Sequence, residues 1–403
     1  MRRRDISKAL FATAAGSTVV AQRAQAQTCM APCYAQTAAE IGAGVTPVNY
    51  AYVPGDVRRY GAVGDGVTPD NAAVALAINL ALYSKLTLGF DLDVIVNCTC
   101  LITTAAIAVN YPIARDLTYL RIWSSNGGGF QVKTPISMFT TSTSPYNGNV
   151  NFPVCTAFVG PPGASGPVSH LIYFDGISFL SNSPGVGTVL QDNQFARMRF
   201  HGCSFYQISL QAGTTQGYTQ SLQITNCNIR HGSGPFYSAG SSAGYFSIDF
   251  KFNNNICEAW TGDFLHVGMA AGGWIVGNCM EGIPGTAILL NGCQGCTIAG
   301  NYWESNGLDV DMTGPGGTQN YAVTGLSLTG NADQTGNTTY VIKWPAASGN
   351  ILGATVGGNF FLGYGHMTPA SATIGNATAD YAQNKAGGTP TPPATALWSN
   401  VPV

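Results

Sequence analysis

A short segment recurs through the second half of the chain, and it limits the possible folds more than any other feature. Each copy has alternating apolar residues, then a small residue or Asn, then an aromatic or aliphatic residue. Aligned on the Ser or Asn, the copies lie at positions 178, 204, 228, 255, 278, 301, 331 and 359, at intervals of 26, 24, 27, 23, 23, 30 and 28 residues. Such a period, without leucine-rich or helical signatures, indicates a parallel β-solenoid in which stacked coils bury each other's apolar faces.

A second register lies further along each coil, where residues 262–267, 285–290 and 307–312 superpose. Alternation along a strand predicts one inward set and one outward set. The inward set is Leu265, Ile288, Val310, Val267, Leu290 and Met312. The outward set is Phe264, Ala287, Asp309, His266, Leu289 and Asp311.

The composition excludes several classes of protein. Only 9% of the 403 residues are charged, against roughly 25% in an average domain. With 45% hydrophobic residues, the chain does not have the composition of a disordered protein. We expect no nucleic-acid partner, because there is no basic stripe to neutralise phosphates. We also expect no membrane span, because the apolar run at 9–21 is shorter than the roughly 20 residues required.

The first 26 residues resemble a bacterial secretory signal, with basic residues, a mild apolar stretch and a small-x-small cleavage site before residue 27. Arg3-Arg4-x-Ile6-x-Lys8 resembles the twin-arginine signal; the alternative is an ordinary basic start to a general export signal. We therefore expect a periplasmic or extracellular bacterial protein. Residues 27–49 form a leader segment, 50–365 the solenoid, and 366–403 a C-terminal tail.

All eleven cysteines lie in the mature chain, so an oxidising compartment leaves at least one of them unpaired. Twin-arginine export carries a folded chain out of a reducing cytosol, so we expect any disulfide to form late. Three close pairs are Cys29 with Cys33, Cys98 with Cys100, and Cys293 with Cys296. Cys29 and Cys33 can pair with each other in the leader, and Cys98 and Cys100 point to one face of a strand. The third pair lacks the further ligands of a zinc site and the helix of a redox motif.

Residues 56–82 carry a more specific pattern. Tyr60-Gly61-Ala62, Gly64-Asp65-Gly66 and Asp70 precede an Ala-rich stretch that predicts a helix, capped by Asp70 or Asn71. This segment resembles the start of the pectate-lyase superfamily domain, in its rhamnogalacturonase/epimerase-like group. The resemblance implies an all-β fold: a right-handed, single-stranded parallel β-helix, a pectin-lyase-like solenoid plugged by an N-terminal capping helix.

The resemblance also implies an enzyme acting on an acidic polysaccharide, but no polygalacturonase signature is present. A lyase needs a basic residue beside its acids, and the coils from 170 to 330 contain few. We expect an exported protein that cleaves a pectin-like or other acidic polysaccharide, as a hydrolase or a lyase. The alternative is a non-catalytic β-helix: an adhesin, a glycan-binding module or an envelope structural protein.

Three of the four glutamates repeat with the coils. Glu258, Glu281 and Glu304 each lie three residues after an aligned Asn, with Gln207 and His231 at the same offset in earlier coils and Gln334 in a later one. Carboxylates about 5 Å apart raise one another's pKa. Their stacking therefore calls for a metal, shared protons or hydrogen bonds to turn amides; the alternative is a corner element with no catalytic role.

A second acidic group lies on the outward set. Asp309 and Asp311 would leave one strand face with Cα atoms ~6.6 Å apart, and inverting glycosidases hold their carboxyl groups about 6.5–9.5 Å apart. His266 would lie on that face two coils away. We predict a catalytic groove with Asp309, Asp311 and His266, edged by Glu281 and Glu304; the alternative is a solvated sheet face.

Two aromatic residues complete this predicted groove. Phe264 and Trp303 would offer an apolar platform for a sugar ring. If the protein is a lyase, the same acids would bind Ca²⁺, because oxygen ligands suit that ion. A hydrolase needs no cofactor.

Overall fold

The computed structural model describes residues 33–103, 107–109, 118–141, 170–190, 198–212, 219–239, 246–267, 269–290, 292–312, 323–333 and 340–343, with short stretches at 351–352, 355–357, 359–361, 367–368, 374–375, 378–379 and 385–386. The predicted export signal at 1–26 lies outside the described residues. No helix among the described residues is long and apolar enough to cross a membrane.

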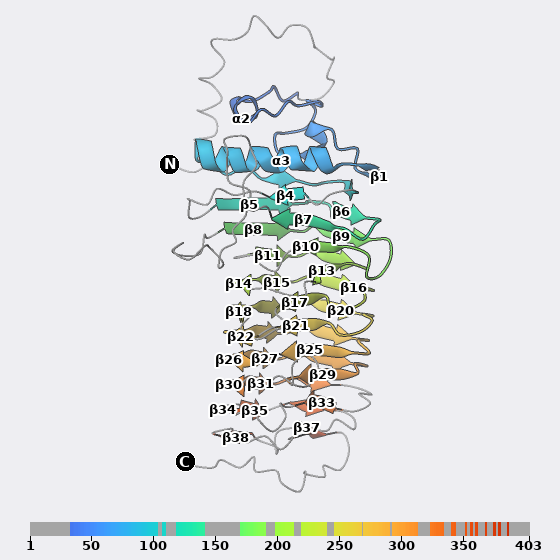
Figure 1. The fold of residues 1–403 in the computed structure, drawn as a ribbon, viewed down its shortest axis with the longest axis vertical. Coiled ribbons are helices and arrows are strands. Elements are labelled where there is room, and N and C mark those ends of the chain that lie inside the picture. The colour runs from blue at the N-terminus through green and yellow to red at the C-terminus, as the bar shows by residue number, and fades with distance from the viewer. Residues whose placement is uncertain are drawn as a thin grey trace, which may run out of the picture.

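Four parallel sheets run side by side along the molecule (Figure 1). The 12-stranded sheet contains β1 (Asp65–Pro69), β3 (Thr99–Ile102), β6 (Gly129–Val132), β9 (Ser178–Ser181), β12 (Ser204–Tyr206), β16 (Asn228–Arg230), β20 (Ile256–Glu258), β24 (Cys279–Glu281), β28 (Tyr302–Glu304), β32 (Ala332–Asp333), β36 (Phe360–Phe361) and β40 (Lys385–Ala386). The 11-stranded sheet contains β2 (Val94–Ile95), β5 (Thr118–Trp123), β8 (His170–Asp175), β11 (Met198–His201), β15 (Gln223–Thr225), β19 (Lys251–Asn253), β23 (Trp274–Val276), β27 (Thr297–Ala299), β31 (Ser327–Thr329), β35 (Thr355–Gly357) and β39 (Thr378–Ala379).

The other two sheets complete each coil. The 10-stranded sheet contains β4 (Ile107–Val109), β7 (Ser137–Thr141), β10 (Thr188–Leu190), β13 (Ser209–Ala212), β17 (Tyr237–Ala239), β21 (Leu265–Val267), β25 (Thr286–Leu290), β29 (Leu308–Asp311), β33 (Tyr340–Lys343) and β37 (Met367–Thr368). The 7-stranded sheet contains β14 (Thr219–Gln220), β18 (Phe246–Ile248), β22 (Met269–Ala271), β26 (Cys293–Gln294), β30 (Val323–Thr324), β34 (Ile351–Leu352) and β38 (Ile374–Gly375).

Successive strands of one coil belong to different sheets, and each strand pairs in parallel with its equivalent in the next coil. β19, β20, β21 and β22 make one coil, and they pair with β23, β24, β25 and β26 of the following coil. This pairing confirms the predicted parallel β-helix. It also continues beyond residue 365, because β37 to β40 extend all four sheets into the segment expected to be a tail.

Left-handed residues turn the chain at three corners in each of the coils between Gly202 and Gly325. In one coil these are Gly277, Gly282 and Gly295, with φ of 69°, 67° and 66°. Asparagine and alanine replace the first two glycines one coil earlier, where Asn254 has φ of 55° and Ala259 has φ of 53°. Asn tolerates this conformation through local hydrogen bonds, whereas Ala is strained in it.

A buried asparagine ladder follows the first corner. Asn278 Nδ2 donates to Phe252 O at 2.8 Å and to Asn301 Oδ1 at 2.9 Å, and Asn278 Oδ1 accepts from the backbone N of Asn255 at 2.9 Å. The ladder comprises Asn255, Asn278, Asn301, Asn331 and Asn359, each 1% exposed. Each amide therefore satisfies backbone groups that would otherwise be buried without partners.

The predicted alignment of the earlier coils is wrong by one residue. Asn228 pairs with Ile256 rather than Asn255, and Cys227 N donates to Asn255 Oδ1 at 2.9 Å. Cys227 therefore occupies the ladder position, and Asn228 faces outward. The error arose because both residues fit the same loose pattern, and only the strand register separates them.

Phenylalanine rings fill the interior of the first coils. Phe174 stacks on Phe200 with ring centroids 4.8 Å apart, and Phe179 stacks on Phe205 at 5.0 Å. These rings lie above one another because parallel, in-register strands place equivalent residues at the inter-strand spacing of about 4.8 Å. The core is thus one continuous column of apolar side chains.

The helix α3 (Asn71–Tyr83) lies across the N-terminal end of the stack (Figure 1), as the sequence predicts. Its N-cap residue is Asp70, but the carboxylate does not bond to the helix. It accepts instead from the backbone N of Val63 at 2.8 Å and of Leu101 at 3.2 Å. Asp70 therefore joins the glycine-rich loop to β3, which explains an acidic residue at that position.

Much of the expected leader packs into this cap. The helix α2 (Ala38–Gly42) carries Glu40, whose Oε1 lies 2.6 Å from Nε of Arg59 in η2 (Val57–Tyr60), a short 3-10 helix. Both side chains are fully buried, and Tyr60 also donates to Glu40 Oε1 at 3.0 Å. The π-helix η3 (Ser84–Leu88) follows α3. Cys33 forms a disulfide, and Cys29 lies outside the described residues.

Candidate functional site

The structure places Asp309 inside the coil, so the prediction that it faces outward is wrong. Asp309 is 0% exposed, and its Oδ1 accepts from Asn306 Nδ2 at 3.0 Å. Val310 is equivalent to Leu265 two coils earlier, so Asp309 is equivalent to Phe264. Phe264 and Leu265 both belong to the core. Asp309 and Val310 are thus both buried in β29, so strict alternation of inward and outward side chains does not hold in this strand.

His266 and Asp311 do lie in one register on the 10-stranded sheet. His266 pairs with Leu289, and Leu289 pairs with Asp311, as the alignment predicts. Asp311 is only 7% exposed, so it does not lie on an open, solvated face. His266 is half-buried, and its Nε2 lies 3.2 Å from Asp263 Oδ2. The hydrogen bond from His266 lowers the pKa of Asp263 below its usual range.

The three glutamates stack as predicted, on the outer face of the 12-stranded sheet. Glu258 pairs with Glu281, and Glu281 pairs with Glu304. Tyr302, on the same strand and face as Glu304, donates its hydroxyl hydrogen to that carboxylate. This hydrogen bond raises the pKa of Tyr302 to about 12. Glu281 and Glu304 are therefore on a different sheet from His266 and Asp311.

The residue before this stack is Arg230, not His231 as predicted. Arg230 pairs with Glu258, and its Nε lies 3.1 Å from Glu258 Oε2. His231 has φ of 60° and Gln207 has φ of 58°, so both are corner residues. Gln334 lies outside the described residues. Arg230, at the end of the row, neutralises part of the negative charge of the glutamates. The sequence alignment did not predict this cation, because it placed His231 there.

The two predicted aromatic platforms are also wrong. Phe264 and Trp303 are both 0% exposed. Phe264 stacks inside the core on Phe236, with ring centroids 5.3 Å apart. Neither ring is available to a sugar. The predicted groove therefore lacks its platforms and its outward Asp309, while the catalytic roles of Asp311, His266, Glu281 and Glu304 stay predictions.

A different surface, which the sequence did not reveal, gathers aromatic and basic side chains in one outward column of the 11-stranded sheet. We call it the aromatic-basic face, and its residues are Arg121, Tyr173, Arg199, Lys251 and Trp274. Gln223 lies between Arg199 and Lys251 in the same column. Trp274 is 51% exposed. The residues come from coils far apart in sequence, so only the strand register brings them together.

Two carboxylates flank the first residue of this face. Arg121 Nη1 lies 3.2 Å from Asp93 Oδ2, and Arg121 Nη2 lies 2.5 Å from Asp175 Oδ2. The Arg121 guanidinium carbon also lies 5.3 Å from the centroid of the Trp123 ring and 5.8 Å from that of Tyr173. Burial raises the pKa of Asp93 despite the opposing charge of Arg121. The two carboxylates thus have different environments.

No protein-family model and no characterised protein matches the sequence. Among solved structures, the chain is similar to the surface adhesin PfbA of Streptococcus pneumoniae, with 13% identity and a TM-score of 0.44, over 83% of this chain and 93% of that chain. It is similar to the Agl-KA catalytic domain at 12% identity and a TM-score of 0.48, over 88% of this chain and 66% of that domain. It is also similar to the A-module of the Azotobacter vinelandii mannuronan C-5 epimerase AlgE6 at 13% identity and a TM-score of 0.30, over 83% of this chain and 100% of that module. The assignment of this chain as a parallel β-helix rests on its own strand pairing.

Proposed function

We propose that this protein binds an acidic polysaccharide along the aromatic-basic face. The observation that supports this is the single outward column in which two cations, Arg199 and Lys251, lie between the aromatic side chains of Tyr173 and Trp274. An aromatic ring offers an apolar face with a polar edge, which suits the apolar face of a sugar ring. A guanidinium binds a carboxylate through two parallel hydrogen bonds.

The spacing of this column favours a polymer over a small ligand. Neighbouring strands lie about 4.8 Å apart, so Arg199 and Lys251, two strands apart, present their charges ~10 Å apart. Trp274 follows on the next strand. A chain lying along the solenoid axis meets a contact at regular intervals, and several weak contacts then add to a useful affinity.

Arg199 is the cation most available to a ligand. Its side chain is exposed, and it forms no salt bridge within the described ranges. Lys251 Nζ, in contrast, lies 3.0 Å from Asp249 Oδ1, and Arg121 is held by two carboxylates. We therefore expect Arg199 to contribute most of the charge-dependent affinity.

The test is binding of polygalacturonate and alginate, with neutral dextran as a comparison ligand, measured by calorimetry at low and moderate salt. We expect Trp274→Ala and Arg199→Gln each to weaken binding about tenfold, the order of one desolvated aromatic or charge-assisted contact. Matched controls on the 12-stranded sheet are Ile256→Ala, which removes another exposed apolar side chain, and Arg230→Gln. Equal losses in the control variants, or equal binding of dextran, would contradict the proposal.

Cleavage of the bound polysaccharide is the second candidate, favoured by the carboxylates around Arg121. A general acid needs a raised pKa, and burial raises the pKa of Asp93. In this candidate Asp93 is the acid and Asp175 the base or nucleophile. Asp93→Asn and Asp175→Asn should abolish release of reducing ends while leaving polysaccharide binding intact.

Asp311→Asn distinguishes this candidate from the groove predicted on the 10-stranded sheet. Loss of turnover in Asp311→Asn, with full turnover in Asp93→Asn, would favour the groove. A lyase would release an unsaturated, ultraviolet-absorbing product instead of a hydrolytic one. The described residues contain no group of three or more His, Cys, Asp or Glu that could hold a metal ion. Ca²⁺ dependence of a lyase stays a prediction, which a chelator tests.

Export stays a prediction as well. Replacing Arg3 and Arg4 by Lys should trap the precursor in the cytoplasm if the twin-arginine route is used. Fractionation of cells expressing the two forms measures this. Unimpaired export of the double-Lys variant would indicate the general secretion route instead.

A further inference from the structure

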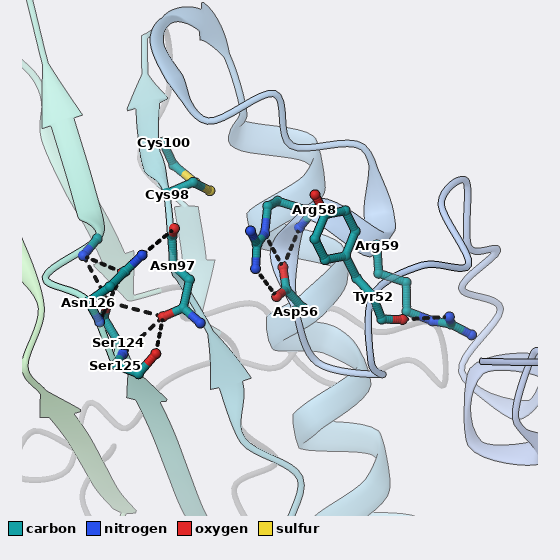
Figure 2. A network of polar contacts seen from close by, with 11 residues as sticks. Tyr52, Asp56, Arg58, Arg59, Asn97, Cys98, Cys100, Ser124, Ser125 and Asn126 are labelled. Atoms are coloured by element: carbon teal, nitrogen blue, oxygen red, sulfur yellow. Dashed lines mark hydrogen bonds and ion pairs between the residues drawn. The ribbon is translucent and has the colours of Figure 1, made fainter. Parts of the chain in front are cut away.

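Two thiols lie side by side at the capped end of the solenoid (Figure 2). Cys98 Sγ lies 3.7 Å from Cys100 Sγ. Only Thr99, the first residue of β3, separates the two cysteines in sequence. An S–S bond is about 2.0 Å long, so oxidation has to close the remaining gap between two sulfur atoms that are already neighbours.

The two thiols differ in access. Cys98 is half-buried, whereas Cys100 is 0% exposed. A reagent from solvent can therefore reach Cys98 but not Cys100. Attack and resolution in thiol–disulfide exchange need this arrangement, with one accessible sulfur and a second sulfur directly behind it.

The charge of Arg58, a side chain that is held in place, acts on Cys98. Asp56 holds Arg58 through two contacts, Nε to Oδ1 at 3.0 Å and Nη2 to Oδ2 at 2.6 Å. The Arg58 guanidinium carbon also lies 4.1 Å from the centroid of the Tyr52 ring. The hydrogen bond from Cys100, together with the charge of Arg58, lowers the pKa of the Cys98 thiol despite its partial burial. A cation beside a half-exposed thiol is the usual setting of a reactive cysteine.

We propose that Cys98 and Cys100 form an oxidisable dithiol, in which Cys98 is the attacking thiol and Cys100 the resolving thiol. The oxidant is a low-molecular-weight disulfide such as glutathione disulfide. The product is an intramolecular disulfide at the start of β3. This proposal does not depend on polysaccharide binding, because it uses neither the aromatic-basic face nor the carboxylates around Arg121.

The reaction balances in two steps. The Cys98 thiolate attacks one sulfur of glutathione disulfide, so a Cys98–glutathione bond forms and one glutathione thiolate leaves. The Cys100 thiol loses its proton and attacks Cys98 Sγ, so the protein disulfide forms and the second glutathione leaves. Two protein thiols are oxidised, one glutathione disulfide is reduced to two glutathione molecules, and the protons end on the leaving thiolates.

Another close pair provides a control inside the same molecule. Cys293 and Cys296 also share a hydrogen bond, but both are buried, with 0% and 3% exposure. Their shared hydrogen bond raises the pKa of Cys293 and lowers that of Cys296, so this pair differs from the first in access and not in the direction of its pKa shifts. A reagent reaches this pair only when the coil opens. Comparing the two pairs therefore separates the effect of solvent access from that of a shared hydrogen bond.

The experiment treats the reduced, folded full chain with glutathione disulfide, alkylates the remaining thiols and maps the peptides by mass spectrometry. We expect a disulfide within the peptide carrying Cys98 and Cys100, formed at least about tenfold faster than any modification of Cys293 or Cys296. Cys100→Ser should stop at the Cys98–glutathione mixed disulfide, and Cys98→Ser should stay unmodified at Cys100. Thermal melting of each variant checks that it is folded.

Two results would overturn the proposal. One is equal modification rates for Cys98 and Cys293 in the folded protein. The other is a wild-type protein that stops at the mixed disulfide, as Cys100→Ser is expected to do. Mapping of the wild-type chain decides the question by itself if a serine variant fails to fold.

Discussion

The capped end and the middle coils bury polar groups in opposite ways. At the capped end a single ion pair, Arg59 with Glu40, lies fully inside the protein, and Arg59 also donates to the carbonyl oxygens of Tyr34, Ala35 and Tyr52. In the middle coils uncharged asparagines repeat from coil to coil, and each satisfies the next.

The difference follows from what each region must cover. The middle coils have equivalent neighbours on both sides, so one uncharged hydrogen-bonding unit can be repeated from coil to coil. The N-terminal end has no preceding coil, and α2, η2 and α3 must cover it with non-repeating segments. A guanidinium with five donors can hold several carbonyl groups of such segments at once. The stability of the cap therefore depends on individual side chains, whereas in the coils equivalent side chains repeat the same stabilising contact.

The largest expected effect is at the capped end. Arg59→Leu leaves the Glu40 carboxylate buried without its cation, and breaking a buried pair in this way costs about 3–5 kcal/mol. Urea unfolding should show that loss in the free energy of unfolding. Lys85→Leu is the control, because both partners of the Lys85–Asp91 pair are partly exposed and such pairs contribute about 1 kcal/mol or less. Similar losses in both variants would remove the distinction between them.

Lowering the pH should destabilise the N-terminal cap before it destabilises the coils. Burial alone would raise the pKa of Glu40, but the hydrogen bond and charge of Arg59 outweigh it and lower that pKa below the usual 4.5. A lowered pKa means that this stabilisation is complete above about pH 4.5 and is lost as the pH falls through the folded-state value. The effect is smaller than that of Arg59→Leu, because protonated Glu40 keeps hydrogen-bonding partners.

Hydrogen exchange along a falling pH series measures this order of opening. Amides of α2 and η2 should lose protection before those of β23 and β24. Asp263 also has a lowered pKa and acts in the same direction, but it is half-exposed. Glu40→Gln should remove much of the pH dependence of the cap. Simultaneous loss of protection in both regions would show that the cap is not the acid-sensitive part.

A smaller loss is expected from the ladder. Asn278→Ala removes the partners of the backbone N of Asn255 and of Phe252 O, at a cost of about 2 kcal/mol for buried groups left unsatisfied. Neighbouring coils should keep their own ladder bonds, so the loss stays local. Gln223→Ala, on the outer face, should change stability by less than about 0.5 kcal/mol. Urea unfolding compares them; no difference between the two would argue against a stabilising ladder.

The smallest effect concerns a corner. Ala259 has φ of 53°, and relief of left-handed strain by Ala259→Gly should exceed the added chain entropy by about 0.5 kcal/mol. Gly282 occupies the equivalent corner with φ of 67°, and an added Cβ would lie 3.5 Å from its nearest neighbour, Ala259 N. Gly282→Ala should thus lose about 1 kcal/mol through backbone strain alone. A rise in melting temperature for Ala259→Gly and a fall for Gly282→Ala would confirm the corner assignment.

Repetition and local composition determined most of the fold from the sequence alone. Spacing placed Glu258, Glu281 and Glu304 in one row, and it placed Leu265, Ile288 and Val310 in one inward column. These predictions succeed because equivalent positions of successive coils pair in register. The helix at 70–82 was equally readable, since its residues are consecutive and its start has a local signature.

Tertiary structure alone decided which side chains meet at the surface and which are withdrawn from it. A one-residue error at Asn228 exchanged Arg230 for His231, because side chains in a strand change face with each residue. Asp309 is buried together with Val310, although strict alternation would place the two side chains on opposite faces of β29. The aromatic-basic face joins Arg121 to Trp274 across strands that the pattern does not align. Corners, insertions and register are set by packing between coils, and no single coil's sequence contains that information.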